Sequence, residues 1–240
     1  MTHGATNCAV GEGVLRSTLI ADLERTMRTA FACREFTDEP VTDDDLVALL
    51  ELARFAPSGG NRQGWRVVVL RDPALRRQVA DEIAPVWNEY VAQVRLGETA
   101  FSTVRPTAAD LASARGHHRA NPLLDDIERV PVVLMVGVDL GALAVMDKDA
   151  DRISIVGGAS VYPFCHNILL AARDRGLGGV LTTFAARVEP ELKPLLRLPE
   201  GHAIAAMLFL GHPKKVPTRL TRRSVDSFTT VDRFDGPPFV

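Results

Sequence analysis

Three short apolar runs, separated by helical patterns, constrain the fold of this chain most. They cover residues 65–70, 130–138 and 202–210, and nearly every residue in them is apolar. Runs of this length are typical of strands that are buried on both faces. A shorter strand is expected near 180–183. Helical spacing of apolar residues predicts helices at 14–32, 42–55, 72–96, 158–175 and 189–196. Thr42 and Asp45, three residues apart, predict an imperfect capping box at the start of the second of these helices. This order predicts an α+β or α/β fold with one central sheet.

The length of 240 residues and the hydrophobic content of 46% suit one domain with a sizeable core. We expect a flexible N-terminus over residues 1–13 and a single domain over residues 14–240. Within it, residues 97–128 form a polar, variable excursion, whose basic stretch 115–119 either binds an anion or lies solvated on the surface. Residues 213–240 form a C-terminal arm with few core residues, which indicates that it wraps a partner subunit in a homodimer.

Composition and spacing exclude several classes of function. The formal net charge of −2 gives no reason to expect a nucleic-acid or membrane partner. No apolar run approaches about 20 residues and no leader is recognisable, so we expect a cytoplasmic protein. The cysteines, Cys8, Cys33 and Cys165, are odd in number and lack CxxC spacing, which argues against a disulfide framework or a metal site. No GxSxG, P-loop or GxGxxG motif supports a hydrolase, an NTPase or a Rossmann protein.

The segment APSGGNRQGW, residues 56–65, joins a predicted helix to a predicted strand but is built like a binding loop. Its proline restricts one φ angle, and its glycines admit conformations that other residues avoid. Ser58, Asn61 and Gln63 supply polar groups that can read a planar, hydrogen-bonding ligand. The alternative is a structural turn whose polar side chains satisfy its own backbone.

Several motifs together resemble the FMN-dependent nitroreductase superfamily over about residues 25 to 235. They are Arg34-x-Phe36-x-x-x-Pro40-Val41, the APSxxNxQxW loop, Gly176-Leu177-Gly178, and Leu210-Gly211-His212-Pro213 before an Arg-rich tail. The resemblance implies an α+β fold with a central mixed sheet flanked by helices. It also implies an intertwined homodimer, with an extended C-terminal arm and two FMN molecules in its interface.

The resemblance assigns residues to the FMN site position by position. Four residues of the loop line the flavin, and Gln63 either joins them or holds the loop's backbone. Arg34 meets the phosphate, together with Arg222 or Arg223, through charge-assisted bonds. The segment after the apolar helix covers one flavin face and points a backbone N–H toward N5. The expected cofactor-binding residues are Arg34, Pro57, Ser58, Gly59, Asn61, Gln63, Gly178, Gly179, Leu181, Thr182, Arg222 and Arg223.

The chain departs from the family pattern in two places. Residues 30–34 read AFACR, where the family has a sequence close to Arg-Arg-Ser-x-Arg. Arg28 is an alternative phosphate ligand; without it, FMN would bind weakly or in an altered pose. Gly64 stands where the family mostly has proline, which makes the loop's exit less rigid.

The resemblance implies an FMN-dependent oxidoreductase that uses NADH or NADPH. Hydride passes to flavin N5, and a small electron-poor acceptor such as a nitroaromatic or a quinone then takes the electrons in a ping-pong cycle. The cofactor does this chemistry, so no side chain is assigned as acid, base or nucleophile. The alternatives are a flavin-binding or flavin-sequestering protein without NAD(P)H turnover, and a flavin-consuming or dehydrogenase relative on the same fold.

Overall fold

The computed structural model of the protein describes residues 22–240, which fall into two compact units. One unit comprises residues 30–215 and contains every β-strand of the described chain. The other comprises the flanking segments, residues 22–29 and 216–240. The predicted flexible segment 1–13 and the first part of the predicted helix 14–32 lie outside the described residues. The expectation of a single domain over 14–240 stays a prediction.

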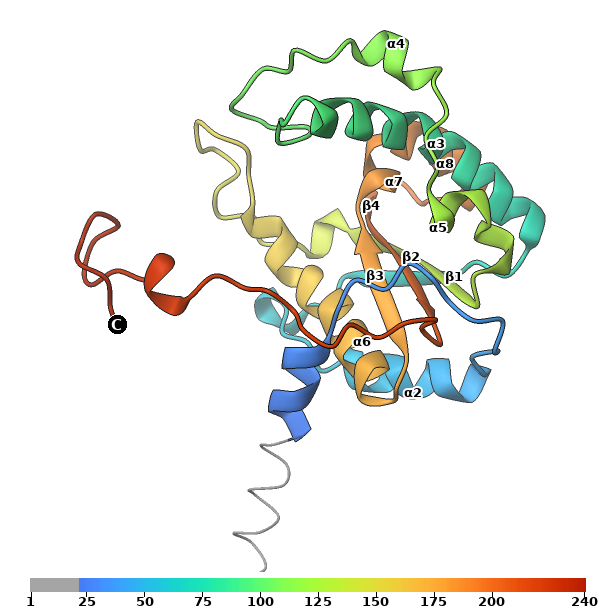
Figure 1. Cartoon of the computed structure of the whole chain (residues 1–240), viewed down its shortest axis with the longest axis horizontal. Coiled ribbons are helices and arrows are strands. Elements are labelled where there is room, and N and C mark those ends of the chain that lie inside the picture. Colours follow the sequence, from blue (N-terminus) through green and yellow to red (C-terminus); the bar gives the residue numbers. More distant parts are fainter. Residues whose placement is uncertain (1–21) are drawn as a thin grey trace, which may run out of the picture. The chain divides into compact units, whose positions relative to one another are not determined.

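A sheet of four strands in the order β1-β2-β4-β3 forms the centre of the larger unit (Figure 1). The strands are β1 (Trp65–Val69), β2 (Val132–Asp139), β3 (Gly178–Thr182) and β4 (His202–Gly211). All neighbouring strands are antiparallel. In the described chain, parallel pairing occurs at an isolated bridge between Ala32 and Gly179. The three apolar runs and the fourth short strand are therefore confirmed as strands, but the edge strand β1 is only partly buried and not covered on both faces as predicted. The sheet was expected to be mixed, and its named strands are all antiparallel.

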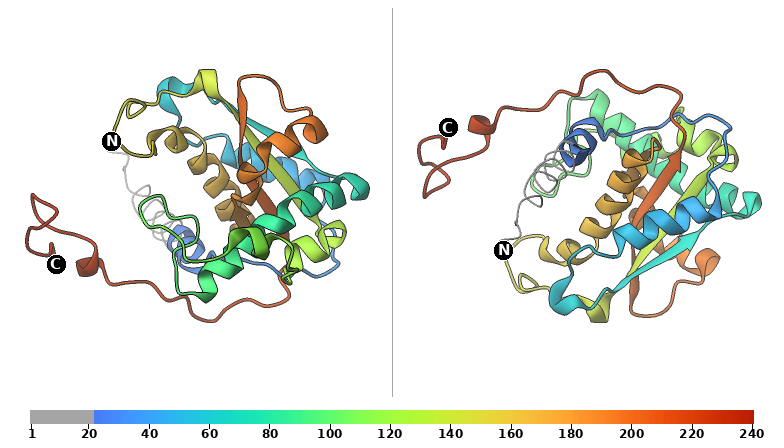
Figure 2. Two further views of the ribbon diagram at one scale, coloured as in Figure 1. Left: turned by 90° about the horizontal axis from the view of Figure 1, so that it is seen from above. Right: turned by 90° about the horizontal axis from the view of Figure 1, so that it is seen from below.

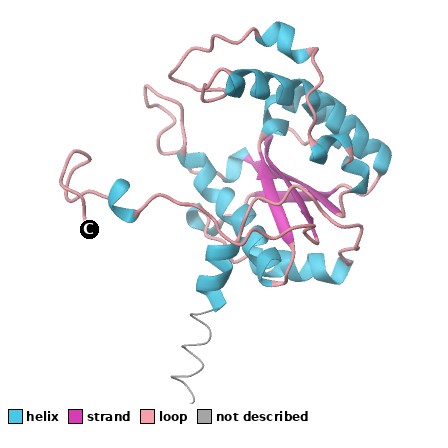
Figure 3. Ribbon diagram, in the orientation of Figure 1, coloured by secondary structure: helices cyan, strands magenta, loops and turns pink. Residues whose placement is uncertain are grey.

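Helices cover both faces of this sheet (Figures 1 and 2), which explains why its central strands are apolar throughout. Helices α2 (Asp43–Ala53) and α6 (Tyr162–Asp174) pack on one face. The other face is covered by α3 (Pro73–Arg95), α5 (Pro122–Asp125), α7 (Phe184–Arg187) and α8 (Glu189–Leu196). Helix α4 (Leu111–Arg115) packs against α3 within the excursion. The predicted α+β architecture is confirmed (Figure 3).

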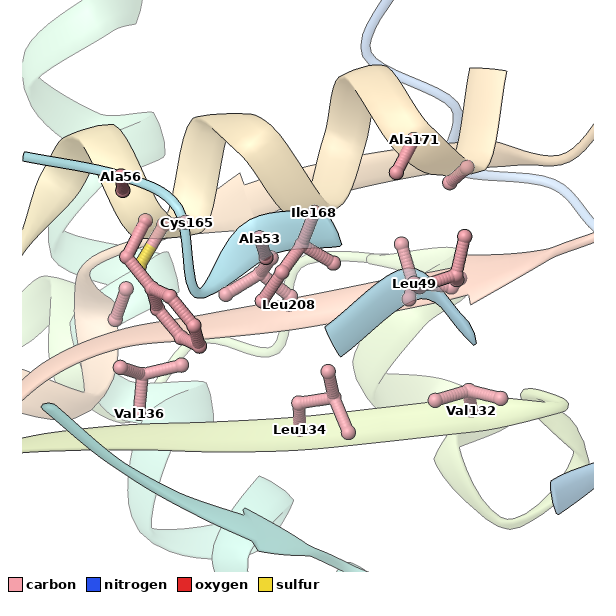
Figure 4. Close-up of a cluster of buried hydrophobic side chains, with 14 of the residues drawn as sticks. Leu49, Ala53, Ala56, Val132, Leu134, Val136, Cys165, Ile168, Ala171 and Leu208 are labelled. Carbon is pink, nitrogen blue, oxygen red and sulfur yellow. The ribbon is translucent and has the colours of Figure 1, made fainter. Parts of the chain in front are cut away.

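The core between α2, α6 and the sheet is closely packed (Figure 4). Leu49, Leu134, Ile168 and Leu208 in this core are all fully buried. Burying one such side chain stabilises the fold by about 1.5–3 kcal/mol. This core fixes α6 on the sheet and so determines where the segment that leads into β3 begins.

Local signals in the sequence set several helix boundaries. The predicted capping box at α2 is formed: the Thr42 hydroxyl accepts from Asp45 N, and the Asp45 carboxylate accepts from Thr42 N. Helix α6 begins at Tyr162, later than the predicted 158, because residues Val156–Ser160 form a 3₁₀ turn. It is followed by Gly176 at φ +81°, a left-handed conformation that glycine adopts without strain.

In the smaller unit, residues 22–29 are helical and residues 216–240 are largely irregular. The latter contain a short 3₁₀ turn, Val225–Ser227, and an isolated bridge between Thr230 and Pro238. Large apolar side chains such as Phe234 and Phe239 are exposed there. That this segment wraps a second subunit stays a prediction. Among residues 22–240, no helix is long and apolar enough to cross a membrane.

Candidate functional site

A cavity of about 530 Å³ lies beside the end of β3, between α3, α7 and the excursion. Its volume falls within the range of about 300–1,000 Å³ that is typical of small-molecule sites. Arg34 stands at its wall together with Leu181 and Thr182, so three of the predicted cofactor-binding residues meet here. A smaller cavity of about 230 Å³ adjoins it, because Arg34 lines both.

Aromatic side chains give this cavity an apolar wall that sequence reasoning did not find. Trp87 stacks on Tyr90 at 5.4 Å between ring centroids, and both meet the edge of Phe184. Such stacked and edge-to-face pairs are worth about 0.5–1.5 kcal/mol beyond their burial, so the three rings stabilise one another. The available signal was the spacing of Trp87 and Tyr90, which places them one turn apart on α3.

Alternate backbone groups at the outer edge of β3 point away from β4. Gly179 O accepts a hydrogen bond from Cys33 N at 3.0 Å, so the polar groups of Gly179 point away from β4. Alternate residues of a strand point their N–H and C=O groups to the same side, which directs those of Leu181 outward as well. Leu181 also lines the cavity. This orientation is the one that the resemblance assigned to the residues covering a flavin.

The two glycines at the start of β3 permit close packing. A Cβ added at Gly178 would lie 2.7 Å from Cys33 Cβ, and one added at Gly179 would lie 2.5 Å from Leu210 Cδ2. Both distances are too short for carbon atoms. Gly178 therefore lets the segment before Arg34 lie directly on β3, whereas Gly179 leaves room for the side chains of Leu210 and Leu169. That the two glycines bind the cofactor stays a prediction.

Within the altered segment 30–34, Cys33 packs on the sheet. Cys33 fills the space beside Gly178 and is 3% exposed, with its thiol directed to Glu35 O at 3.3 Å. Burial raises the pKa of this thiol, which makes a reactive thiolate unfavourable. Arg34 itself is exposed, and its Nη1 lies 3.4 Å from Ala32 O. Arg28, the alternative phosphate ligand, belongs to the smaller unit and pairs with Glu24 at 2.7 Å.

Two further cations near Arg34 were missed by sequence reasoning. Arg129 and Lys214 line the smaller cavity beside it, and Arg129 pairs with Asp38 at 3.2 Å. The motif order contained no signal for them, because they follow α5 and β4 in the chain and reach this place only through the fold.

The loop before β1 holds itself in a strained shape. Ser58 Oγ accepts from Gln63 N at 2.9 Å, and Gln63 Nε2 donates to Asn61 Oδ1 at 3.1 Å. Asn61 and Gln63 both have positive φ angles, 53° and 50°. Each such residue costs on the order of 1–2 kcal/mol, and strain of this kind is concentrated at functional sites. Gln63 was expected either to line the flavin or to hold the loop's backbone, and in the structure it makes hydrogen bonds within the loop.

The loop is anchored to the body at both ends. Gly59 N donates to the buried Ser160 Oγ at 3.1 Å, and Gly64 O accepts from Asp139 N at 2.9 Å. A Cβ at Gly64 would lie 2.7 Å from Ala142 Cβ, so this position has no room for the proline of the family pattern. Pro57 and Asn61, by contrast, are exposed and free to meet a ligand or a second chain.

The loop and the cavity lie at opposite edges of the sheet. The loop precedes β1 and the cavity adjoins β3, and β2 and β4 separate these two strands. Three interstrand spacings of about 4.8 Å place them roughly 14 Å apart across the sheet. One chain thus brings Arg34, Leu181 and Thr182 together but leaves the loop residues elsewhere.

A buried carboxylate on α3 organises the far wall of the cavity. Glu89 is 2% exposed and accepts from Arg115 Nη1 at 2.6 Å and from Arg187 Nε at 3.2 Å. Arg187 also lies over the ring of Phe101 at 4.6 Å. Arg115 of the basic stretch 115–119 is therefore a partner of Glu89. Among residues 22–240, no group of three or more His, Cys, Asp or Glu side chains could hold a metal ion.

Comparison with known proteins identifies this arrangement. A model of the nitroreductase family matches residues 27–212, most of the chain. The chain belongs to the nitroreductase family. The nitrobenzene nitroreductase of Ectopseudomonas oleovorans is 28% identical over 89% of this nitroreductase-family chain and 97% of its own length. The NADH dehydrogenase of Thermus thermophilus is 31% identical over 75% of this chain and 81% of its own length.

Other relatives widen the range of chemistry on this fold. Iodotyrosine deiodinase 1 of Rattus norvegicus is 25% identical over 80% of this chain, which spans only 63% of that protein. The crystal structure of a nitroreductase with bound FMN from Desulfitobacterium hafniense aligns with a TM-score of 0.58 at 22% identity. It covers 88% of this chain and 98% of its own, and this likeness shows a shared nitroreductase fold.

The remaining predicted site residues of this nitroreductase-family protein are the two tail arginines. Arg222 and Arg223 belong to the smaller unit, where both are exposed and Arg222 Nη1 donates to Thr221 O at 2.7 Å. Their role at the phosphate stays a prediction.

Proposed function

We propose that this protein is an FMN-dependent oxidoreductase that passes electrons from NADH or NADPH to a small electron-poor acceptor, such as a nitroaromatic or a quinone. One observation carries the proposal. In a member of the nitroreductase family, one cavity is lined by Arg34 and by Leu181 and Thr182 at the end of β3.

The donor set of this cavity fits FMN. Arg34 is a guanidinium suited to a phosphate, since its planar fork forms two charge-assisted bonds. The outward N–H of Leu181 is a donor for the edge of the ring system. The wall of Trp87, Tyr90 and Phe184 provides a flat apolar surface. FMN would supply the electron transfer, and the residues of the chain bind it, orient it and exclude water.

A homodimer is part of the proposal. The loop with Pro57, Ser58, Gly59 and Asn61 lies at the sheet edge remote from the cavity, so the loop of a second copy would complete the site. This arrangement explains the strain in the loop, because a rigid loop loses little entropy when it meets a ligand bound by another chain. Arg222 and Arg223 are proposed as further phosphate ligands.

The electron donor and acceptor are proposed from the relatives. One is named an NADH dehydrogenase and another a nitrobenzene nitroreductase, and the chain spans most of the length of each. No side chain is proposed as an acid, a base or a nucleophile, and the two described cysteines are buried and free. Burial raises the pKa of the Cys165 thiol to about 12, so this group stays protonated.

Absorption spectra of the purified protein test the proposal. After reconstitution with FMN, we expect a flavin band at about 450 nm that bleaches anaerobically on addition of NADH or NADPH and returns with an electron acceptor. A protein that cannot be reconstituted with FMN would refute the proposal. A flavin band that neither nicotinamide bleaches would instead support a flavin-binding or flavin-sequestering protein.

Reductive dehalogenation is a second candidate, favoured by the similarity to the iodotyrosine deiodinases. It would use the same cavity and the same flavin. Release of iodide from an iodinated phenol by the chemically reduced holoprotein distinguishes it from nitroreduction, since a nitroaromatic acceptor yields no halide. Absence of halide release would exclude this candidate.

A further inference from the structure

The charge on the cavity wall is one-sided. Within the described part of the chain, the charged lining consists of Arg34 and Arg187 and includes no carboxylate. The remaining wall is largely aromatic and aliphatic. If Arg34 binds a phosphate, as the proposed function requires, Arg187 is left as the cation of the cavity.

Arg187 is held rigidly, with its outer nitrogens available. Its Nε donates to Glu89 at 3.2 Å, and its guanidinium stacks over Phe101 at 4.6 Å. Within residues 22–240, its two Nη atoms have no hydrogen-bond partner, and 48% of the side chain is exposed. A guanidinium fixed in this way has lost its rotamer freedom before a ligand arrives, so the entropic cost of binding is low.

Glu89 does not cancel this charge. The same carboxylate also accepts from Arg115 Nη1 at 2.6 Å, so one buried negative charge is shared by two guanidinium groups. The cluster therefore keeps a net positive charge, and only Arg187 of the two arginines lines the cavity. Partial exclusion of water by the aromatic wall strengthens its attraction for an anion.

We propose that Arg187 is a specificity-determining residue that selects aromatic acceptors carrying a carboxylate. The inference rests on the proposed function, because it names the class of substrate for the same cavity. The aromatic ring of the acceptor would lie on the flavin face that the apolar wall leaves open, and its carboxylate would accept hydrogen bonds from the free Nη atoms of Arg187. Glu89 acts as a positioning residue, because it directs the guanidinium without touching the acceptor.

Turnover of two matched acceptors tests the selection. 4-Nitrobenzoate and 4-nitrobenzamide have nearly the same shape and differ in charge. We expect Arg187→Met to lower kcat/KM for 4-nitrobenzoate by about 10- to 100-fold, the loss expected for a charge-assisted hydrogen bond, and to change kcat/KM for 4-nitrobenzamide by less than about 3-fold. The variant should fold, because Arg115 remains as a partner for Glu89.

Arg115→Met is the matched control, since it removes the same charge from the same carboxylate but lies outside the cavity lining. It should leave the ratio of the two kcat/KM values within about 3-fold of wild type. Two results would overturn the proposal. One is an equal loss of kcat/KM for 4-nitrobenzoate and 4-nitrobenzamide in Arg187→Met. The other is an equal change of the ratio of these two values in Arg187→Met and Arg115→Met.

Binding of a redox-inert pair separates this inference from the proposed function. Calorimetric titration of the holoprotein with benzoate and with benzamide needs no electron transfer. The comparison of these two ligands in the wild-type protein is also independent of whether a variant folds. We expect benzoate to bind at least 10-fold more tightly than benzamide, and this preference to disappear in Arg187→Met. Failure of the wild type to prefer benzoate would overturn the inference, even if NAD(P)H turnover is present. Benzoate preference without NAD(P)H turnover would refute the proposed function alone.

Discussion

Substitution of Gly178 by alanine tests how the segment that carries Arg34 is held on the sheet. The added methyl carbon would lie 2.7 Å from Cys33 Cβ, 2.8 Å from Cys33 Sγ and 3.3 Å from Pro213 Cβ. Carbon atoms in contact are normally about 3.5–4.0 Å apart. The segment that contains Cys33 and strand β3 must therefore separate by roughly 1 Å. The hydrogen bond from Cys33 N to Gly179 O ties Cys33 to the strand, and separation would stretch this bond.

The cost follows from two opposing effects. Overpacking of this kind destabilises by about 1–3 kcal/mol. Replacing glycine where φ is not positive stabilises by about 0.4–1 kcal/mol, because the unfolded chain loses freedom. We therefore expect Gly178→Ala to lower the free energy of unfolding by about 0.5–2.5 kcal/mol. FMN affinity should fall as well, because Arg34 follows Cys33 directly.

Urea denaturation, followed by circular dichroism at a fixed protein concentration, measures the effect. The matched control is Gly116→Ala, whose added Cβ would meet its nearest neighbour at 3.8 Å, an ordinary contact. Cys33→Gly removes Cβ and Sγ, the two atoms that would lie nearest to the new methyl group. The double variant should therefore be more stable than the sum of the single effects by about 1 kcal/mol. Strict additivity, or a Gly178→Ala protein as stable as wild type, would show that the close contact does not hold the segment.

Three other substitutions probe the phosphate ligand, a loop and a helix cap. Arg34→Ala should weaken FMN binding by about 1.5–3 kcal/mol in a fluorescence titration, whereas alanine at the exposed Arg66 of β1 should not; equal affinities would show that Arg34 does not bind the phosphate. Hydrogen bonds from Ile155 N and the Ser154 hydroxyl hold the pKa of Asp147 well below its usual value of 3.8. Because the folded pKa is depressed, the hydrogen bonds to the Asp147 carboxylate should stabilise the loop fully above about pH 4, and this stabilisation should be lost as the pH falls further. Amide exchange at Ile155, corrected for its intrinsic rate, should therefore accelerate at acid pH. The same amide should exchange faster at pH 7 in Asp147→Asn, and an unchanged rate would contradict the role of this carboxylate. Thr42→Ala removes the cap of α2 and should cost about 1 kcal/mol in denaturation; a loss below about 0.3 kcal/mol would contradict it.

Much of the fold could be predicted because the signals were local. The strands at 130–138 and 202–210 appear where continuous apolar runs predicted them, since burial on both faces leaves little choice of residue. The run at 65–70 also forms a strand, but this edge strand is only partly buried. The cap at Thr42 followed from residues three positions apart. The extra turn before Tyr162 was missed because apolar periodicity does not separate a 3₁₀ turn from the helix that follows it.

The candidate site was only partly predictable. Arg34 and Leu181 belong to recognisable motifs, and the structure places both at one cavity. The aromatic wall and the Glu89 cluster were not found, because their members are ordinary helical and loop residues until α3, α7 and the excursion meet. The sequence left two roles open for Gln63, contact with the flavin or support of the loop. The structure shows its side-chain amide donating to Asn61 Oδ1 within the loop.

By itself, the sequence determined the family, the kind of fold and the residues suited to a phosphate and a flavin, because motif order and apolar periodicity are written along the chain. Only the tertiary structure decided which of these residues meet. It placed Arg34 beside Leu181 through the packing of Cys33 on Gly178, and it left the loop at Asn61 on the opposite edge of the sheet. Strand order has no trace in local sequence, since it depends on which strands pair with which across the sheet. That is why the separation of the loop from the cavity, across the width of the sheet, becomes visible only in three dimensions.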